Sequence, residues 1–398
     1  MTRLCKCRIA WIFAAILIVS AAACAQPNYP EFEPVLESFE ARLAADVAAD
    51  SIGSISAGVV VGDRIIWARG FGWADREKQI AADAETIYRV GSISKSFTAV
   101  VLVQLAEKGI LDLDDRVEKY LPVIEHVTNR PEGTEPITLR QLASHTAGLI
   151  REPRLPRAAA GPIGSWEDKI IASIPTVEFR YHPGERYSYS NIGFGILGLT
   201  ISRAAGKPFI QLVNELIFKP LRMKSSTFII TPQLEGRLAT GYQVRRNGTV
   251  DTGSPALEHA GRGYKVPNGG IYSTAGDLAR FISAQTGAFR SQILTGDSRA
   301  EMQRFQTPVR TTQNGDSTGY GLGFSLRVNE DGLRTVSHGG SVAGYNAHMI
   351  FDPGSRIGVV LLRNYNGGAV NLGRAARDLL VDLVRIYRVL PGTNIGTQ

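Results

Sequence analysis

The stretch Gly91-Ser92-Ile93-Ser94-Lys95-Ser96-Phe97-Thr98 opens an apolar segment that runs to Gly109. Residues 92–108 have helical spacing, and a glycine such as Gly109 is the usual stop after a helix. Ser92-x-x-Lys95 is the only Ser-x-x-Lys in the sequence. Positions i and i+3 share a helix face, so the Lys95 amine can approach the Ser92 hydroxyl and accept its proton. The competing interpretation is a serine cap followed by a solvated lysine.

The segments on either side of this helix predict strands near both ends of the chain. Upstream, residues 32–49 have helical spacing, and residues 55–61 and 64–70 predict a hairpin closed by Gly62-Asp63. Between about 110 and 310 the pattern is mostly short helices and loops. Four more strands and a last helix are predicted near the C-terminus, at 321–328, 333–337, 347–351, 357–363 and 369–387.

This distribution predicts an α+β fold with one antiparallel sheet flanked by helices. The sheet would be built from N- and C-terminal segments, with a mostly helical subdomain inserted between them. We place the whole domain at 32–385, its α/β part at about 32–110 and 315–390, and its helical part at about 111–314.

The first 25 residues have the layout of a signal peptide. A positive start is followed by an apolar run at 9–19, which is too short to span a bilayer as a permanent helix, and then by alanines. Two processing routes remain open. Cleavage after Ala25 gives a soluble secreted protein, whereas a lipoprotein signal ending before Cys24 leaves a lipidated cysteine and a possible membrane attachment. Both routes predict export to the periplasm or the medium.

Cysteine and charge counts exclude several classes of function. The three cysteines, Cys5, Cys7 and Cys24, all precede residue 25, so a disulfide framework, a cysteine zinc site and a catalytic cysteine are excluded for the body. Removal of the signal peptide takes away three positive charges and lowers the formal net charge from +7 to +4. Such a mild charge gives little support to nucleic acid binding. The six scattered histidines show no metal-ligand spacing, and no metal or cofactor is predicted.

Two more short motifs carry groups that suit hydrolysis. Tyr189-Ser190-Asn191 is the only Tyr-x-Asn, in a turn before an apolar helix; a phenol can share a proton with a lysine, and a carboxamide can bind a substrate amide. His338-Gly339-Gly340 follows a predicted strand, where glycines let the backbone approach a ligand closely. Each motif alone has an ordinary structural interpretation, a helix cap or a histidine at a strand end. Gly193-x-Gly195-x-x-Gly198 has no preceding strand, so it indicates helix packing and not a dinucleotide site.

Taken together and in this order, the three motifs resemble those of the class C β-lactamase and D-alanyl-D-alanine carboxypeptidase superfamily, which also includes esterases and D-aminopeptidases. The resemblance extends over most of residues 32–385. It implies an acyl-enzyme at Ser92, proton transfer by Lys95 and Tyr189, and a substrate amide held by Asn191. The backbone N–H groups of Ser92 and Ser341 would form the oxyanion hole.

One departure from the family pattern bears on the substrate. The lactamases carry Lys-Thr-Gly where this chain has His338-Gly339-Gly340, and histidine at that position occurs in peptidase and esterase members. A histidine is mostly neutral at pH 7, so it lacks the constant positive charge that meets a β-lactam carboxylate. We therefore expect an exported serine hydrolase that acts on a D-amino-acid peptide or a small ester, with a β-lactamase as the alternative. A non-enzymatic alternative is a penicillin- or peptidoglycan-binding sensor with little turnover.

Residues 150–166 and 242–268 are predicted to line the cleft and set the specificity. The sequence does not fix the oligomeric state.

Overall fold

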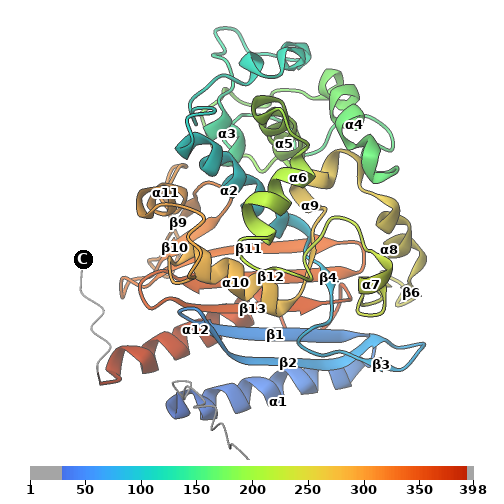
Figure 1. The fold of residues 1–398 in the computed structure, drawn as a ribbon, viewed down its shortest axis with the longest axis vertical. Helices are drawn as coiled ribbons and strands as arrows, with labels where there is room; N and C mark the ends of the chain where they lie inside the picture. Colours follow the sequence, from blue (N-terminus) through green and yellow to red (C-terminus); the bar gives the residue numbers. More distant parts are fainter. Residues whose placement is uncertain (1–28, 392–398) are drawn as a thin grey trace, which may run out of the picture.

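The computed structural model describes residues 29–391, so the predicted signal peptide and Cys24 lie outside the described residues. A nine-stranded antiparallel sheet crosses the centre of the molecule (Figure 1). Its strands, from one edge to the other, are β3 (Ile80–Ala81), β2 (Arg64–Asp75), β1 (Ser54–Val61), β13 (Ile357–Arg363), β12 (Tyr345–Asp352), β11 (Arg334–Val342), β10 (Ser325–Val328), β9 (Ser317–Tyr320) and β8 (Arg310–Thr311). The first and last thirds of the chain therefore meet where β1 pairs with β13.

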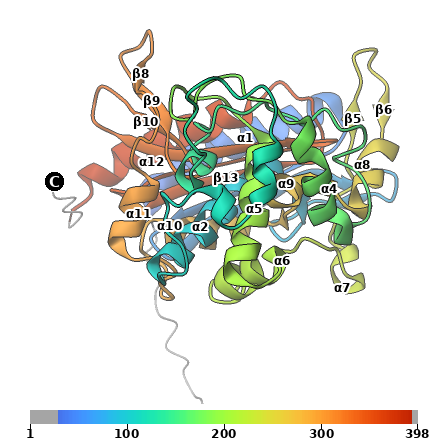
Figure 2. The ribbon, with the colours of Figure 1, turned by 90° about the horizontal axis from the view of Figure 1, so that it is seen from above.

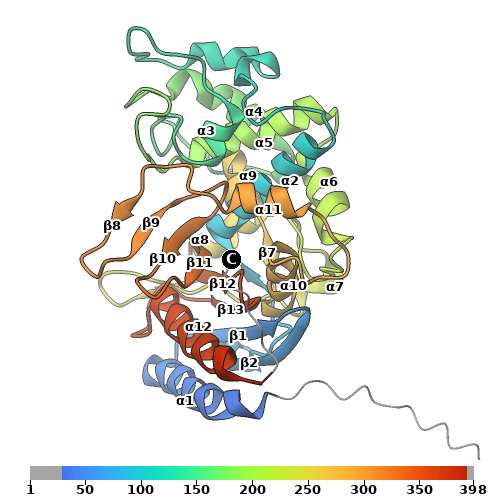
Figure 3. The same ribbon diagram turned by 90° about the vertical axis from the view of Figure 1, so that its left-hand side faces the viewer.

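Both faces of the central strands are covered. Every residue of β1 and of β13 is buried, which suits their runs of β-branched and aliphatic residues. On one face lie α1 (Glu33–Asp50) and α12 (Leu372–Val389), side by side below the sheet (Figure 3). The buried residues of α12 follow helical spacing, as in Leu372, Ala376, Leu379 and Leu383.

The other face carries α10 (Ala275–Gln285), α2 (Ser94–Glu107) and the helical part of the molecule above them. The remaining helices are α3 (Leu139–Ala143), α4 (Trp166–Ser173), α5 (Asn191–Ala205), α6 (Phe209–Val213), α7 (Pro232–Glu235), α8 (Gly253–Leu257), α9 (Val266–Gly269) and α11 (Gly296–Met302). Two short ribbons, β4 (Tyr88–Arg89) with β7 (Tyr272–Ser273) and β5 (Gln243–Val244) with β6 (Val250–Asp251), complete the strands. Seen from above, β8–β10 project at one end and β5–β6 at the other (Figure 2).

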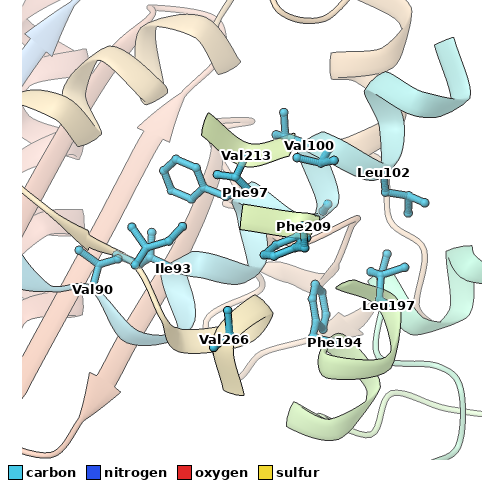
Figure 4. Close-up of a cluster of buried hydrophobic side chains, with 14 of the residues drawn as sticks. Val90, Ile93, Phe97, Val100, Leu102, Phe194, Leu197, Phe209, Val213 and Val266 are labelled. Carbon is cyan, nitrogen blue, oxygen red and sulfur yellow. The ribbon is translucent and has the colours of Figure 1, made fainter. Parts of the chain in front are cut away.

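The core of the helical part surrounds α2. Phe97 of α2 stacks on Phe281 at 4.0 Å between ring centroids, and Phe218 meets it edge-on. Figure 4 shows Phe97, Val100 and Leu102 of α2 among side chains of α5, α6 and α9. All residues of α2 from Ser94 to Leu105 are buried. The helix that follows Ser92 is therefore fixed on all sides, which gives the site a rigid base.

The predicted α+β class and the antiparallel sheet are confirmed. The predicted two-residue turn between β1 and β2 is also present, with Gly62 at φ +61°. One predicted strand, 321–328, is wrong in its first half, because residues 321–324 form a turn between β9 and β10. Gly323 adopts φ +74° there, and its carbonyl accepts a hydrogen bond from the Ser96 hydroxyl of α2 at 2.7 Å. Contact with α2 holds this turn, and such a tertiary contact leaves no trace in the local pattern.

Several element boundaries also differ from the prediction, among them the end of β2, which runs on to Asp75 and not to Gly70. Strand β11 runs on to Val342 and does not end at Ser337, so His338 lies inside a strand. Strand β12 begins at Tyr345. The last helix begins at Leu372, three residues later than predicted, after Asn371 caps it by accepting the Arg374 N–H at 2.9 Å. Within residues 29–391, no helix combines the length and the apolar character needed to cross a membrane.

Candidate active site

Ser92 lies in a single 3₁₀ turn, Gly91–Ile93, that leads directly into α2. Gly91 adopts φ +52°, a conformation that a glycine reaches without strain. A Cβ on Gly91 would also lie 2.9 Å from the backbone N of Ser341, so glycine allows β11 to approach this turn. The Ser92 hydroxyl is half-buried and faces a cleft of about 740 Å³.

Lys95 is fully buried one helical turn after Ser92. Its Nζ lies 3.0 Å from Ser92 Oγ and donates to the carbonyl oxygen of Asn268, also at 3.0 Å. Burial lowers the pKa of Lys95 well below its usual value, and the charges of Lys265 and Arg262 lower it further. A neutral amine with a free lone pair is thus favoured beside the serine.

Tyr189 stands over the same amine. Lys95 Nζ lies 4.9 Å from the centre of its ring, and the imidazole of His145 packs against the ring at a tilt of 34°, with 4.2 Å between the ring centroids. Burial raises the pKa of Tyr189 to about 12, although a hydrogen bond with the Ser92 side chain and the charge of Arg151 oppose this rise. The phenol therefore holds its proton at neutral pH, next to the nucleophile.

Asn191 is the first residue of α5, and its side chain is fixed from outside the helix. Its Nδ2 donates to Glu152 Oε1 at 2.6 Å, and Glu152 Oε2 pairs with Lys265 Nζ at 3.2 Å. The backbone carbonyl of Asn191 accepts from Asn268 Nδ2 at 2.9 Å. One buried residue, Asn268, thus binds both Lys95 and Asn191 and sets their relative positions.

The edge of β11 forms the opposite wall. Its pairing with β10 ends at Ser325–Ser337, so residues 338–342 have no strand on that side within the described part of the chain. A Cβ on Gly340 would overlap the carbonyl oxygen of Val90 and lie 3.2 Å from Ser92 N. The two glycines, Gly91 and Gly340, therefore allow the turn that carries Ser92 and the β11 edge at Ser341 to lie against each other.

The protonation of His338 follows from its two hydrogen bonds. Nδ1 lies 2.7 Å from the carbonyl oxygen of Gly339, which can only accept, so Nδ1 carries the proton. Nε2 then accepts from the phenol of Tyr320 at 2.9 Å. Burial lowers the pKa of His338 to about 3, with a further contribution from the charge of Lys95. His338 is therefore a neutral ring with both nitrogens occupied, and it brings no charge to the cleft.

The structure brings all eight predicted residues to one region, but they differ in whether they line the cleft. Six of them line the cleft: Ser92, Tyr189, His338, Gly339, Gly340 and Ser341. Lys95 and Asn191 are buried behind it and are not among the lining residues. The predicted loop 150–166 contributes Arg151, whereas 242–268 contributes no lining residue; residues 363 and 366–373 line the cleft in its place.

Three residues with clear contacts in the site were not singled out from the sequence, Asn268, Glu152 and Tyr320, although Glu152 and Asn268 fall within the two ranges predicted to line the cleft. Asn268 is followed by Gly269-Gly270 and Tyr320 lies between glycines, so glycine neighbours were the only local signal. Glu152 carried none. Within residues 29–391, no group of three or more histidine, cysteine, aspartate or glutamate side chains is placed to hold a metal ion.

A buried lysine beside a serine, a tyrosine ring next to both and a strand edge close to the serine turn, on an α+β fold, define the class of active-site serine hydrolases with a Ser-x-x-Lys motif. Comparison with known proteins agrees. The Beta-lactamase family model matches residues 39–383, and the chain belongs to this family. Its relatives are serine hydrolases of the β-lactamase fold.

Individual relatives cover nearly the whole chain. The chain is 27% identical over 388 residues to the D-alanyl-D-alanine-carboxypeptidase/endopeptidase AmpH of Escherichia coli K12, covering 94% of this chain and 96% of AmpH. The octameric penicillin-binding protein homologue from Pyrococcus abyssi superposes with a TM-score of 0.73 at 26% identity, over 88% of this chain and 77% of that one. A D-stereospecific amidohydrolase from Streptomyces sp. shares the fold, with a TM-score of 0.67 at 23% identity over 87% and 97% of the two chains.

Proposed function

We propose that this protein is an exported serine hydrolase that forms an acyl-enzyme at Ser92 and then hydrolyses it. The observation that carries the proposal is the 3.0 Å approach of the buried Lys95 amine to Ser92 Oγ. Because burial and two nearby cations disfavour its protonated form, this amine can serve as a base near neutral pH. The expected substrate carries a carbonyl in an amide, peptide or ester bond.

In the first half-reaction Ser92 Oγ attacks the carbonyl carbon, and its proton passes to Lys95 Nζ. The carbonyl oxygen becomes an oxyanion that accepts from the backbone N–H groups of Ser92 and Ser341. When the tetrahedral adduct collapses, the bond to the leaving group breaks. The leaving nitrogen or oxygen takes a proton from Lys95 through the phenol of Tyr189, which leaves an ester at Ser92.

In the second half-reaction a water molecule attacks the ester carbon and gives a proton to the Tyr189–Lys95 pair. Collapse then returns that proton to Ser92 Oγ and releases the acid. Asn191 would hold the substrate amide with its side-chain oxygen, since Glu152 already accepts from its Nδ2. No cofactor takes part in these steps.

A D-amino-acid peptide or a small ester is favoured over a β-lactam as substrate. The neutral state of His338 supports this choice, because it supplies no cation to meet the carboxylate that β-lactams carry beside the ring. The likeness to AmpH, named a D-alanyl-D-alanine-carboxypeptidase/endopeptidase, supports the peptide over the ester.

The decisive experiment is a substrate panel of activated esters, D-Ala-D-Ala peptides and a chromogenic cephalosporin, run with wild-type protein and Ser92→Ala. Turnover of peptide or ester that falls to background in Ser92→Ala supports the proposal. Rapid cephalosporin turnover would make the protein a β-lactamase. Stable labelling by penicillin without turnover of any panel member would make it a sensor. Full ester turnover by Ser92→Ala would refute the mechanism.

Export is proposed from residues 1–25 and has its own test. Expression of the full chain in a bacterial host, followed by mass measurement of the mature protein, separates the two processing routes. Cleavage after Ala25 predicts an unmodified chain starting at Gln26. Lipidation predicts a chain that starts at Cys24, carries acyl mass and fractionates with membranes. An intact N-terminus in the cytoplasm would contradict export.

A further inference from the structure

A second hollow of about 550 Å³ adjoins the catalytic cleft. It lies between β8–β12 and the first turns of α12, and it shares Ser325, Asn371 and Gly373 with the cleft as common wall. Figure 3 shows α12 below the sheet with one end directed toward β8–β10. Because α12 packs mainly on β12 and β13, the outer face of β9 and β10 is left open beside it. We refer to this second hollow as the side groove.

The charges around the two hollows are of one sign. Arg310, Arg327, Arg374 and Arg377 line the side groove, Arg151 and Arg363 line the cleft, and no aspartate or glutamate lines either. Three of the six have an acidic neighbour. Arg327 pairs with Asp316 at 3.1 Å, Arg363 with the buried Asp46, and Arg151 lies 3.8 Å from Glu152.

The other three, Arg310, Arg374 and Arg377, form no ion pair with a carboxylate in the part of the chain that the structure describes. Their charge acts on the groove. The charge of Arg377 contributes to lowering the pKa of His348, which burial brings to about 4, and His348 lines the same groove. Burial raises the pKa of Tyr187 at the groove's other end, and the charge of Arg310 opposes this rise.

We propose that the side groove is a subsite for an anionic, carboxylate-bearing part of the substrate, bound chiefly by Arg310 and Arg377. Guanidinium groups take carboxylates through paired, charge-assisted hydrogen bonds, and three of them without acidic partners leave that capacity free. The N-terminus of the 18-residue helix α12 adds positive potential at the same place. The inference rests on the proposed function, since the substrate would extend from Ser92 into the groove.

This assignment changes where the positive charge of the site is expected. The family's lysine is replaced by the neutral His338, and the lining arginines that have no acidic partner, Arg310, Arg374 and Arg377, lie on β8 and α12. They would therefore act on a group remote from the scissile bond. The substrate class is accordingly a peptide or ester with an acidic side chain or a second carboxylate, and not a small neutral ester.

The first test is a binding measurement that needs no turnover. Tricarballylate, a tricarboxylate, is titrated calorimetrically into full-length Ser92→Ala protein and into the same protein with Arg310→Gln and Arg377→Gln added. We expect the added pair to weaken binding about tenfold, and rising salt to weaken the binding of the Ser92→Ala protein. The matched control is Arg388→Gln, in the last turn of α12, added to the same Ser92→Ala protein. It should bind tricarballylate as tightly as Ser92→Ala protein does. Unchanged binding in the Arg310/Arg377 variant, or no binding to Ser92→Ala protein, would overturn the proposal.

The second test uses substrate preference in the Ser92-containing protein. We compare kcat/KM for two D-alanyl-D-alanine peptides that are identical except at one position. One peptide carries a glutamate there, and the other carries a glutamine. The ratio should favour the acid in wild type and fall about tenfold in Arg310→Gln/Arg377→Gln, while Arg388→Gln keeps the wild-type ratio. A ratio near one in wild type would overturn the subsite. If neither a peptide nor an ester of the panel is turned over, the hydrolase proposal fails, and the calorimetric result still decides whether the groove binds anions.

Discussion

The phenol of Tyr320 lies 2.9 Å from Nε2 of His338, so the histidine that replaces the family's lysine is held as a neutral ring. Because burial lowers the pKa of His338 to about 3, we expect no titration of this ring between about pH 5 and about pH 8. Long-range proton–nitrogen spectra of the histidine rings measure this directly, with the His338 signals assigned by their loss in His338→Gln. They should show one tautomer, protonated at Nδ1, across that range. A midpoint near pH 6.5 would contradict this description.

Burial lowers the pKa of Lys95 most, and among the charged neighbours Lys265 contributes most. We therefore expect Lys265 to affect the pH at which activity is lost on acidification. The charge of Lys265 lowers the pKa of Lys95, and its pairing with Glu152 at 3.2 Å restrains a carboxylate that acts the other way. Lys265→Met should therefore raise the pKa of Lys95, so that kcat/KM starts to fall at a higher pH as the solution is acidified. The exposed Lys224→Met serves as the matched control. A profile of Lys265→Met that superposes on wild type would contradict the account.

Two adjacent glycines on β11 should respond differently to the same substitution. A Cβ on Gly340 would overlap the carbonyl oxygen of Val90 and force β11 away from the turn that carries Ser92. A Cβ on Gly339 would lie 3.3 Å from the His348 ring and 3.8 Å from the Ala347 carbonyl oxygen, without overlap. We expect Gly340→Ala to lower kcat about 100-fold or more, because the two amides no longer converge. The kcat of Gly339→Ala should stay within a few-fold of that of wild type. Equal kcat values for the two variants would contradict a role for the β11 edge in catalysis.

A buried ion pair joins α1 to β13, the strand that pairs with β1. Arg363 of β13 binds Asp46 of α1, and their side chains are 3% and 1% exposed. Asp46→Ala leaves the guanidinium buried without its carboxylate, so we expect a loss of about 3–5 kcal/mol in the free energy of unfolding, measured by urea denaturation. Glu40, whose bridge to Arg69 is exposed and 3.9 Å long, is the control. Glu40→Ala should change stability by less than about 1 kcal/mol; equal effects would refute the assignment.

Short motifs, together with the family resemblance they carry, predicted the residues that the structure brings to the region of the cleft. Ser92 and Lys95 are one helical turn apart, so their contact follows from helix geometry once the helix is assigned. The turn between β1 and β2 likewise follows from Gly62-Asp63. The fold class followed from strands at both ends of the chain, because such strands can bury their apolar faces by joining one sheet.

The features that the sequence did not predict depend on partners distant in the chain. The lysine amine is held by the backbone carbonyl of Asn268, an atom that every residue possesses and no motif can mark. The turn at 321–324 exists because α2 holds Gly323, which a local strand pattern does not reveal. The hydrogen bond that occupies Nε2 of His338 comes from Tyr320, which lies on another strand. The positive charge of the side groove comes from β8 and α12, more than 60 residues apart at Arg310 and Arg377.

The central claim, a covalent acyl-enzyme at Ser92, is tested most directly by intact-protein mass measurement after reaction with a fluorophosphonate and, separately, with penicillin, followed by peptide mapping. We expect one fluorophosphonate adduct per chain, located on the peptide that contains Ser92 and absent from Ser92→Ala. With penicillin we expect an adduct at the same residue or none. An adduct on any other residue would contradict an acyl-enzyme at Ser92. So would wild-type protein that hydrolyses an activated ester but forms no adduct with the fluorophosphonate.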